Sequence, residues 1–247
     1  MHRLDQRLRR LAASVNRLRR KWLSLALLCT ICMLSCLSGR IYAAEDAVFS
    51  HKNDAMKIAL TFDDGPHAEY TQQILDILDE YNVRATFFMI GINAQRHPEL
   101  VSAVADAGHE IGNHTYSHDK PYQMSIEALL GELQTTEEII ESSSDCAPVL
   151  FRPPEGVNTP VISEAASEMG YRIILWSVDT RDWDSRTTLQ SAVDNVLTNT
   201  SSGSIILFHD AVSRKVSITP DAIRTVIPAL LDRGYQFVTV SELLGTS

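Results

Sequence analysis

Cysteine is scarce in most of this sequence. Of the four cysteines in 247 residues, Cys29, Cys32 and Cys36 lie in one apolar run near the N-terminus, and only Cys146 follows that run. The part of the chain beyond the run therefore cannot form an internal disulfide. Its stability has to come from a packed core.

Basic residues are also few beyond the N-terminus. Residues 1–21 hold eight of the 22 Lys and Arg but one of the 31 Asp and Glu, which leaves 14 basic and 30 acidic residues in 22–247. A body with this excess of negative charge repels phosphate backbones, so we expect no nucleic acid partner. The apolar content of 45% is that of an ordinary globular protein.

One long stretch near the N-terminus carries no charge. It is WLSLALLCTICMLSCLSG, residues 22–39, and it follows the basic residues directly. Its length lies between that of a signal-peptide core and that of a membrane span. Lys and Arg before the stretch, with few after it, predict that the head stays inside and the body is exported. Cleavage after Ala43 and retention as an anchor both fit, so we expect a secreted or a membrane-anchored protein.

The composition divides the chain into four parts. They are a basic cytoplasmic head (1–21), a signal anchor or signal-peptide core (22–39), a linker (40–56) and a folded domain (57–247). From Lys57 onward, short apolar runs alternate with segments of helical periodicity. We expect strands at Ile58–Phe62, Ala85–Ile90, Glu110–Asn113, Val149–Arg152, Ile173–Val178, Ser204–Phe208 and Gln236–Val240.

Helices are predicted between these strands. Two of them have explicit start and stop signals, with a threonine cap, a proline at the first position and a closing glycine. These signals are Thr159, Pro160 and Gly170 in the first case, and Thr219, Pro220 and Gly234 in the second. Alternating strands and helices predict a parallel sheet covered on both faces. Because about 190 residues are few for a full eight-fold barrel, we expect an α/β fold of about seven parallel strands, an open or incomplete (β/α) barrel, with a doubly wound sheet as the alternative.

Unusual polar clusters follow five of the predicted strands. They are Asp63-Asp64, HTYSH (114–118), RPPEG (152–156), DTRDW (179–183) and His209-Asp210. Each cluster alone has an ordinary structural explanation, such as a turn, a surface bend or a hydrogen-bonded histidine at a strand end. All five, however, lie at the carboxyl ends of strands, where parallel α/β barrels place their active sites. Their coincidence favours one site.

The residue types of these clusters fit metal-assisted hydrolysis. His114 and His118, four residues apart, and one of the two aspartates provide three ligands and leave a position for water, as in catalytic zinc sites. The other aspartate can then take a proton from that water, and His209 can give a proton to an amine leaving group. The spacing does not decide which aspartate is the ligand.

At these residues the sequence resembles a known family. TFDDG, HTYSH, RPPEG, DTRDW and LFHD are similar to the five ordered motifs of the polysaccharide deacetylases, carbohydrate esterase family 4, and the similarity runs from about Lys57 to Leu244. The resemblance implies that residues 57–247 are a polysaccharide deacetylase catalytic domain with a distorted (β/α) barrel. It also implies one divalent metal ion, usually Zn²⁺, and hydrolysis of N-acetyl or sometimes O-acetyl groups on glycans.

The resemblance also assigns roles by position. Its implied catalytic and binding residues are Asp63 as the general base, Asp64, His114 and His118 as metal ligands, Arg152 holding the base, Asp182 tuning the catalytic His209, and Trp183 and Leu207 as the apolar walls that receive the acetyl methyl group. One position departs from the family, because Glu155 stands where its third motif usually carries tyrosine. The family uses the backbone N–H of that residue as an oxyanion donor, while the side chain lines the substrate groove.

We therefore expect a hydrolase that removes N-acetyl groups from N-acetylglucosamine-type residues of an extracellular glycan. Peptidoglycan and chito-oligosaccharide are the expected substrates. The alternatives are an O-acetyl esterase acting on xylan and a non-catalytic surface protein that binds glycans. The sequence does not specify the glycan or its chain length, the native metal, the effect of Glu155 or the oligomeric state.

Overall fold

The structure is a computed structural model that describes residues 47–53, 55–211 and 216–246. The predicted head, the apolar stretch and the first residues of the linker lie outside the described residues, so the four-part division stays a prediction. Among the helices of the described residues, none has both the length and the apolar character needed to span a bilayer.

Strands and helices alternate along the described chain. The strands are β1 (Lys57–Asp63), β2 (Thr86–Met89), β3 (Glu110–Asn113), β4 (Leu150–Phe151), β5 (Arg172–Ile173), β6 (Val178–Asp179), β7 (Ile205–His209) and β8 (Gln236–Val238). The α-helices are α2 (Tyr70–Glu80), α3 (Gly91–Arg96), α4 (Pro98–Asp106), α5 (Ile126–Ser144), α6 (Pro160–Met169), α7 (Leu189–Asn199), α8 (Thr219–Asp232) and α9 (Val240–Leu244). Two short 3₁₀ turns, η1 (Pro121–Gln123) and η2 (Pro154–Gly156), lie in the loops.

The sheet is parallel and curled. Seven strands form the row β5-β4-β3-β2-β1-β7-β6, and β8 pairs with the start of β1. The strands β5 and β6 lie at opposite ends of this row, yet only residues 174–177 separate them in the sequence. A flat row would place its ends about 29 Å apart, whereas five residue steps span at most about 18 Å. The row must therefore curl until its ends approach, which confirms the expected distorted barrel.

The segment between β5 and β6 corrects one strand prediction. We expected a single strand over Ile173–Val178, but β5 ends at Ile173, Ile174 forms only an isolated bridge with Val48, and the chain then crosses from one end of the row to the other before β6. Most N–H groups of this segment still donate to backbone carbonyls, but two of its own carbonyls face a side chain. The carbonyl oxygens of Ile174 and Leu175 accept hydrogen bonds from the Arg152 guanidinium, at 3.1 and 3.0 Å. The prediction was wrong because it could not anticipate a side chain as the hydrogen-bond partner.

The helix signals were right at one helix and partly wrong at another. Helix α6 begins after Thr159, whose hydroxyl accepts a hydrogen bond from the Ile162 N–H, and it ends at Gly170 with φ of 75°. In α8, however, Thr219 is the first helical residue and does not cap the helix. Its hydroxyl instead donates to Asp182 Oδ2 at 2.7 Å. The threonine thus supports a loop of the barrel's carboxyl end.

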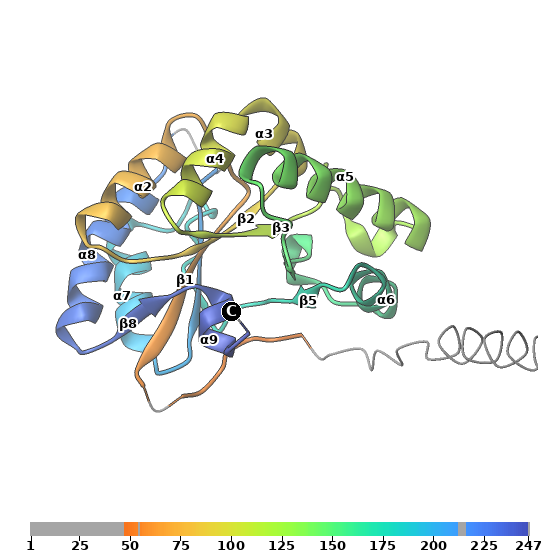
Figure 1. Cartoon of the computed structure of the whole chain (residues 1–247). Coiled ribbons are helices and arrows are strands. Elements are labelled where there is room, and N and C mark those ends of the chain that lie inside the picture. Colours follow the sequence, from red (N-terminus) through yellow and green to blue (C-terminus); the bar gives the residue numbers. More distant parts are fainter. Residues whose placement is uncertain (1–46, 54, 212–215, 247) are drawn as a thin grey trace, which may run out of the picture. The chain divides into compact units, whose positions relative to one another are not determined.

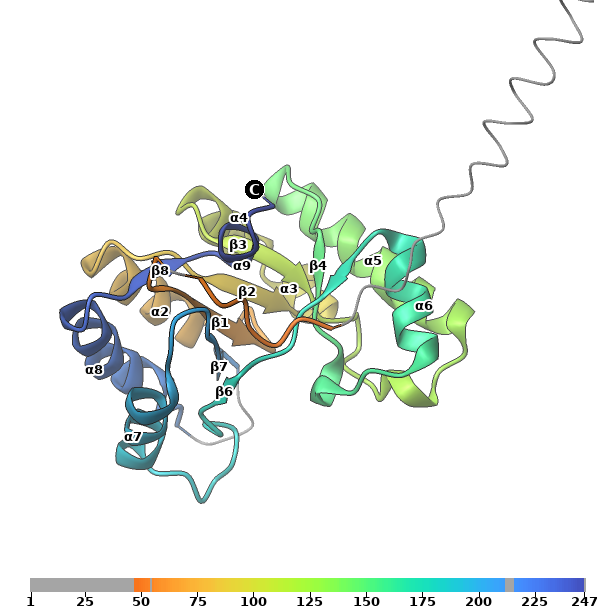
Figure 2. The same ribbon diagram turned by 90° about the horizontal axis from the view of Figure 1, so that it is seen from below.

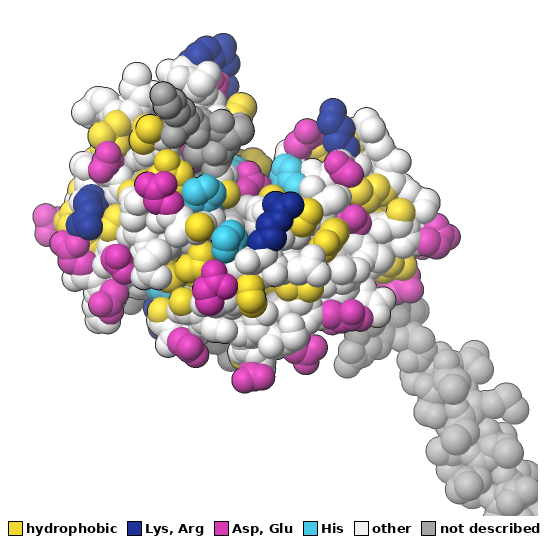
Figure 3. All heavy atoms as spheres, turned by 90° about the horizontal axis from the view of Figure 1, so that it is seen from above, with side chains coloured by type: hydrophobic (Ala, Val, Ile, Leu, Met, Phe, Trp, Pro, Cys, Tyr) yellow, Lys and Arg dark blue, Asp and Glu magenta, His cyan; other side chains and the backbone are white. Residues whose placement is uncertain are grey.

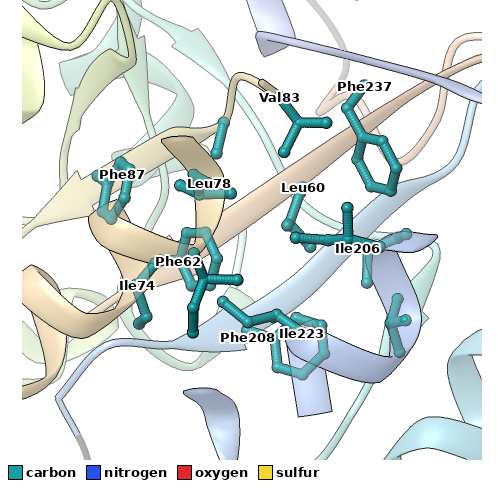
Figure 4. Close-up of a cluster of buried hydrophobic side chains, with 14 of the residues drawn as sticks. Leu60, Phe62, Ile74, Leu78, Val83, Phe87, Ile206, Phe208, Ile223 and Phe237 are labelled. Atoms are coloured by element: carbon teal, nitrogen blue, oxygen red, sulfur yellow. The ribbon is translucent and has the colours of Figure 1, made fainter. Parts of the chain in front are cut away.

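The helices cover the outer surface of the curled sheet. Figures 1 and 2 show α2, α7 and α8 together on one part of this surface, and α3, α4, α5 and α6 on the rest. Alternate side chains of β1 point outward, and Leu60 and Phe62 pack in the main hydrophobic core beneath these helices (Figure 4). The intervening residues, Thr61 and Asp63, point to the barrel interior and contact Arg152 there. The alternation of β1 thus separates the core from the site.

We predict that the aromatic cluster on β1 dominates stability. Phe62 is fully buried and stacks on Phe87 with ring centroids 5.0 Å apart. Truncation in Phe62→Ala leaves a cavity and is expected to lower the free energy of unfolding by about 3–5 kcal/mol. The matched control, Phe49→Ala, removes a ring that is 55% exposed and is expected to cost less than about 1 kcal/mol. Urea denaturation measures both values, and equal losses would contradict the prediction.

Candidate functional site

The polar clusters that follow the strands meet in one cavity at the carboxyl end of the barrel. The pairing register places Asp63 of β1 beside His209 of β7. The cavity has a volume of about 510 Å³ and is lined by Asp63, Asp64, His114, His118, Glu155, Gly156, Trp176, Asp179, Trp183, Leu207 and His209. Figure 3 looks onto this end and shows histidine side chains close together among acidic and apolar ones. The expected gathering of the clusters at one end of the sheet is thus seen.

Asp64, His114 and His118 form a candidate metal site. Asp64 Oδ1 lies 3.4 Å from His114 Nε2 and 3.2 Å from His118 Nε2. Ligands at 2.0–2.1 Å from a tetrahedral ion are separated by about 3.3 Å. Asp64 Oδ1 is also buried and has no hydrogen-bond partner among the described residues, which is unfavourable without a cation. The donor set and its spacing therefore fit a divalent ion.

The two histidines are prepared for ligation by their surroundings. His114 is buried, and its Nδ1–H donates to the carbonyl oxygen of Arg152 at 2.6 Å, so that the lone pair of Nε2 faces Asp64. His118 has φ of 59°, and its backbone N–H donates to Thr115 Oγ1. Burial lowers the pKa of His118. A neutral imidazole is the form that binds a metal.

The second aspartate, Asp63, is held by a buried arginine. Arg152 is fully buried, and its Nη1 donates to Asp63 Oδ1 at 2.6 Å and to Thr61 Oγ1 at 2.8 Å. The guanidinium also lies over the Phe88 ring, 4.1 Å from the ring centroid. The other carboxylate oxygen, Asp63 Oδ2, lies 3.9 Å from His114 Nε2. Asp63 thus offers one oxygen to the arginine and the other to the metal cluster.

His209 lies across the cavity and is bonded to Asp182. Its Nδ1–H donates to Asp182 Oδ1 at 2.7 Å, and its backbone N–H donates to Asp182 Oδ2 at 2.8 Å. Burial of the imidazole opposes protonation, but the hydrogen bond and the charge of Asp182 outweigh it and raise the pKa of His209 to about 9. The hydroxyl of Thr219 also donates to Asp182. His209 is therefore a cation at neutral pH, with Nε2 as its remaining proton donor.

A fully buried carboxyl group supports the turn that carries Asp64. Asp210 Oδ2 accepts a hydrogen bond from the Thr71 hydroxyl at 2.6 Å. Burial, assisted by the negative charges of Asp64 and Asp63, raises the pKa of Asp210 to about 7. The carboxyl lies against Gly65, where a Cβ atom would come within 2.0 Å of Asp210 Oδ2. Only glycine fits at this position, directly after Asp64, which itself has φ of 76°.

The remaining wall of the cavity is apolar and partly exposed. Trp183 is 48% exposed and lines the cavity together with Leu207 and Trp176. Glu155 lies at the exposed edge with φ of 60°, and its Oε2 accepts a hydrogen bond from the Tyr122 hydroxyl at 3.2 Å. The cavity therefore joins a polar reaction centre to an apolar and aromatic surface.

Eight of the ten predicted site residues lie on the cavity wall. They are Asp63, Asp64, His114, His118, Glu155, Trp183, Leu207 and His209. Arg152 and Asp182 are buried behind the wall, and each is bonded to a lining residue. The structure thus places all ten together, while the roles assigned to them stay predictions.

Sequence reasoning missed several contributors to the site. Trp176 lines the cavity, and Thr61 and Thr219 bond to Arg152 and Asp182. Trp176 lay inside a predicted strand and resembled a core residue, while Thr219 matched the pattern of a helix cap. None of these three residues lies in one of the polar clusters at strand ends, and those clusters were the signal that identified the other site residues.

The sequence of this chain is similar to those of known deacetylases. The family model described as polysaccharide deacetylase matches residues 50–174. A peptidoglycan-N-acetylglucosamine deacetylase of Bacillus cereus is 44% identical over 194 residues, which cover 78% of this chain and 90% of that protein. A chitooligosaccharide deacetylase of Rhizobium leguminosarum bv. trifolii is 37% identical over 217 residues, covering 83% of this chain and 100% of that protein.

A solved structure is similar as well. It is the crystal structure of a peptidoglycan N-acetylglucosamine deacetylase in complex with 4-naphthalen-1-yl-N-oxidanyl-benzamide, with a TM-score of 0.77 and 39% identity over 81% of this chain and 92% of that one. The chain therefore belongs to the polysaccharide deacetylase family, carbohydrate esterase family 4.

Proposed function

We propose that this protein is an exported, metal-dependent enzyme that removes N-acetyl groups from N-acetylglucosamine-type residues, with peptidoglycan as its first substrate and chito-oligosaccharide as its second. As a member of its family the chain is a deacetylase hydrolase whose substrate is an acetylated glycan. One observation carries the finer proposal. The candidate metal ligands lie between an aspartate held by Arg152 and a cationic histidine held by Asp182.

Asp64, His114 and His118 are the proposed metal ligands. When a divalent ion such as Zn²⁺ is bound, it lowers the pKa of a bound water toward 7 and polarises the acetyl carbonyl. The protein contributes the orientation of the ligands, because the Arg152 carbonyl fixes the His114 ring.

Asp63 is the proposed general base. Its Oδ1 is committed to Arg152, which leaves Oδ2 beside the metal cluster to accept the proton of the attacking water. Asp64 is less suited to this task, because its Oδ1 faces both imidazoles. The arginine contact therefore divides the labour between two adjacent aspartates.

His209 is the proposed general acid. A departing amine must take up a proton as the C–N bond breaks, and the protonated imidazole across the cavity can donate it from Nε2. Asp182 holds the ring by Nδ1 and stabilises its charge. We propose that Trp183 and Leu207 receive the acetyl methyl group and that the backbone N–H of Glu155 donates to the developing oxyanion.

His209 and the Arg152–Asp63 pair also distinguish the proposed deacetylase from an O-acetyl esterase and from a protein that only binds glycans. An alkoxide leaving group, as in acetylxylan, needs less help from an acid than an amine does, so the raised pKa of His209 favours the amide substrate. A protein that only binds glycans would have no use for a buried Arg152–Asp63 pair whose second oxygen, Asp63 Oδ2, faces the metal cluster. The proposed reaction accounts both for this pair and for the raised pKa of His209.

We predict that release of acetate depends on the metal and on Asp63. Full-length protein with Zn²⁺ is expected to release acetate from chito-oligosaccharides and peptidoglycan fragments faster than from acetylxylan, and a chelator should abolish the release. Asp63→Asn keeps the hydrogen-bond acceptor for Arg152 but loses the base, so we expect a fall of about 10²–10⁴-fold in kcat with Zn²⁺ retained.

Asp76→Asn, at an exposed position on α2, serves as the matched control and should leave the rate unchanged. Absence of acetate release with every divalent metal tested would contradict the proposed function. Faster release from acetylxylan would favour the esterase instead.

We predict that the alkaline limit of activity is set by His209. The protonated form is the active one, so kcat/KM should fall as the pH rises through about 9. In Asp182→Asn the compensating charge is lost, and the limit should move toward the ordinary histidine pKa of about 6.5. Asp194→Asn, at an exposed site on α7, should keep the wild-type profile. A profile that is identical in wild type and Asp182→Asn would exclude His209 as the titrating acid.

We predict that Glu155 lowers kcat/KM for glycans that carry carboxylates near the reacting sugar. Peptidoglycan carries carboxylates on alternate sugars, either of the lactyl group or of the peptide that is amide-linked to it, whereas chito-oligosaccharide is neutral, and like charges in the groove repel. Glu155→Gln should raise kcat/KM on peptidoglycan fragments by about two- to fivefold relative to chito-oligosaccharide, and high salt should remove the difference. Glu141→Gln, at an exposed site on α5, is the control, and the same gain on both glycans would refute the charge effect.

A further inference from the structure

The segment between the two histidine ligands has an unusual backbone. His114 and His118 are joined by Thr115, Tyr116 and Ser117, and both Thr115 and His118 have positive φ, of 66° and 59°. Residues with a side chain rarely adopt this conformation, and they keep it only where the surroundings hold them. The position of His118 relative to His114 therefore depends on contacts made from outside the segment.

One carboxylate makes most of these contacts on the N–H side. Glu132 Oε2 accepts three hydrogen bonds, from the Tyr116 N–H at 2.9 Å, the Ser117 N–H at 2.7 Å and the Ser117 hydroxyl at 2.9 Å. Glu132 is half-buried, and it has no ion pair with any of the described residues. Its negative charge is thus balanced by the N–H and O–H groups of the ligand segment itself.

The carbonyl side of the same peptide units is held by a different element. The N–H of Gly91 donates to the Thr115 carbonyl at 2.9 Å, and the N–H of Ile92 donates to the Tyr116 carbonyl at 3.0 Å. These donors belong to the start of α3, on the opposite side from Glu132 of α5. The segment is therefore held between two helices. Helix α3 binds its carbonyl groups, and the Glu132 side chain of α5 binds its N–H groups.

Helix α5 provides Glu132 with a fixed base. The helix is capped by Ser125, whose hydroxyl accepts a hydrogen bond from the Ala128 N–H, and it packs into the core through Leu129 and Leu133. The carbonyl of Leu133 accepts a hydrogen bond from Asn113, the residue before His114. Helix α5 thus holds the chain immediately before the first ligand and again, through Glu132, just before the second.

We propose that Glu132 is a positioning residue that sets the place of His118 in the metal site. It touches neither the metal ligands nor the reacting atoms, and it acts through the two peptide N–H groups and the hydroxyl that precede His118. The inference rests on the proposed function, since it assumes that Asp64, His114 and His118 bind a divalent ion. Loss of such an outer contact typically weakens metal binding by 10–100-fold.

The test is the Zn²⁺ affinity of the full-length protein, measured by competition with a chelator of known affinity. Glu132→Ala should bind Zn²⁺ about 10–100-fold more weakly than wild type, while its unfolding midpoint in excess chelator stays close to that of the wild-type protein. Glu132→Gln keeps an oxygen at the same reach and should stay within about threefold of wild type. The matched control is Glu138→Ala, which removes an exposed carboxylate from the same helix and should leave the affinity unchanged.

A further variant covers the case in which Glu132→Ala does not fold. Glu132→Asp keeps the charge but is shorter by one methylene group, so it should bind Zn²⁺ more weakly than Glu132→Gln does. Wild-type affinity in Glu132→Ala or in Glu132→Asp would overturn the positioning role while the metal site stands. Absence of stoichiometric Zn²⁺ in the wild-type protein would instead overturn the proposed function, and with it this inference.

Discussion

The buried contact between Arg152 and Asp63 is the interaction on which the rest of the site depends. A fully buried guanidinium is costly unless its donors are satisfied, and here they reach Asp63, Thr61 and the carbonyls of Ile174 and Leu175. The same residue therefore links the end of β1 to the segment that crosses between the two ends of the sheet. Its own carbonyl accepts the Nδ1–H of His114. One side chain and one peptide group thus connect closure of the barrel, the proposed base and a proposed metal ligand.

This contact also explains how two adjacent aspartates come to differ. Asp63 ends a strand, points inward and meets a permanent cation, whereas Asp64 turns away with φ of 76° and leaves a buried oxygen facing two imidazoles. On the far side, Asp182 offsets the burial of His209 and keeps it charged. Environment, rather than residue type, assigns different tasks to chemically identical groups. The separation is fixed by the fold before any substrate binds.

The sequence was sufficient for the alternation of strands and helices and for the ten predicted site residues, but not for Trp176, Thr61 and Thr219. Five polar clusters at strand ends predicted the cavity, because the carboxyl ends of parallel strands meet at one edge. The division of labour between Asp63 and Asp64 could not be derived from spacing, since it depends on where Arg152 reaches in space; it came from the family resemblance. The carbonyls that accept from Arg152 carry no sequence signal, because every residue has one. Thr219 was predicted to be a helix cap because it directly precedes Pro220, and nothing in the sequence indicates that its hydroxyl donates to Asp182 instead.

The reaction centre and the substrate surface are built on different parts of the fold. Asp63 and Arg152 are buried at the end of a strand or directly after it, and Asp182 is buried in the loop after β6, where hydrogen bonds to His209 and Thr219 hold it. Glu155 and Trp183, in contrast, are exposed and lie in loops. A change in an exposed loop residue alters what the groove accepts at little cost to stability, whereas a change behind the cavity wall leaves a buried charge unpaired. The chemistry of this protein is therefore constrained by its core, and that is why its motifs specify the reaction far better than they specify the glycan.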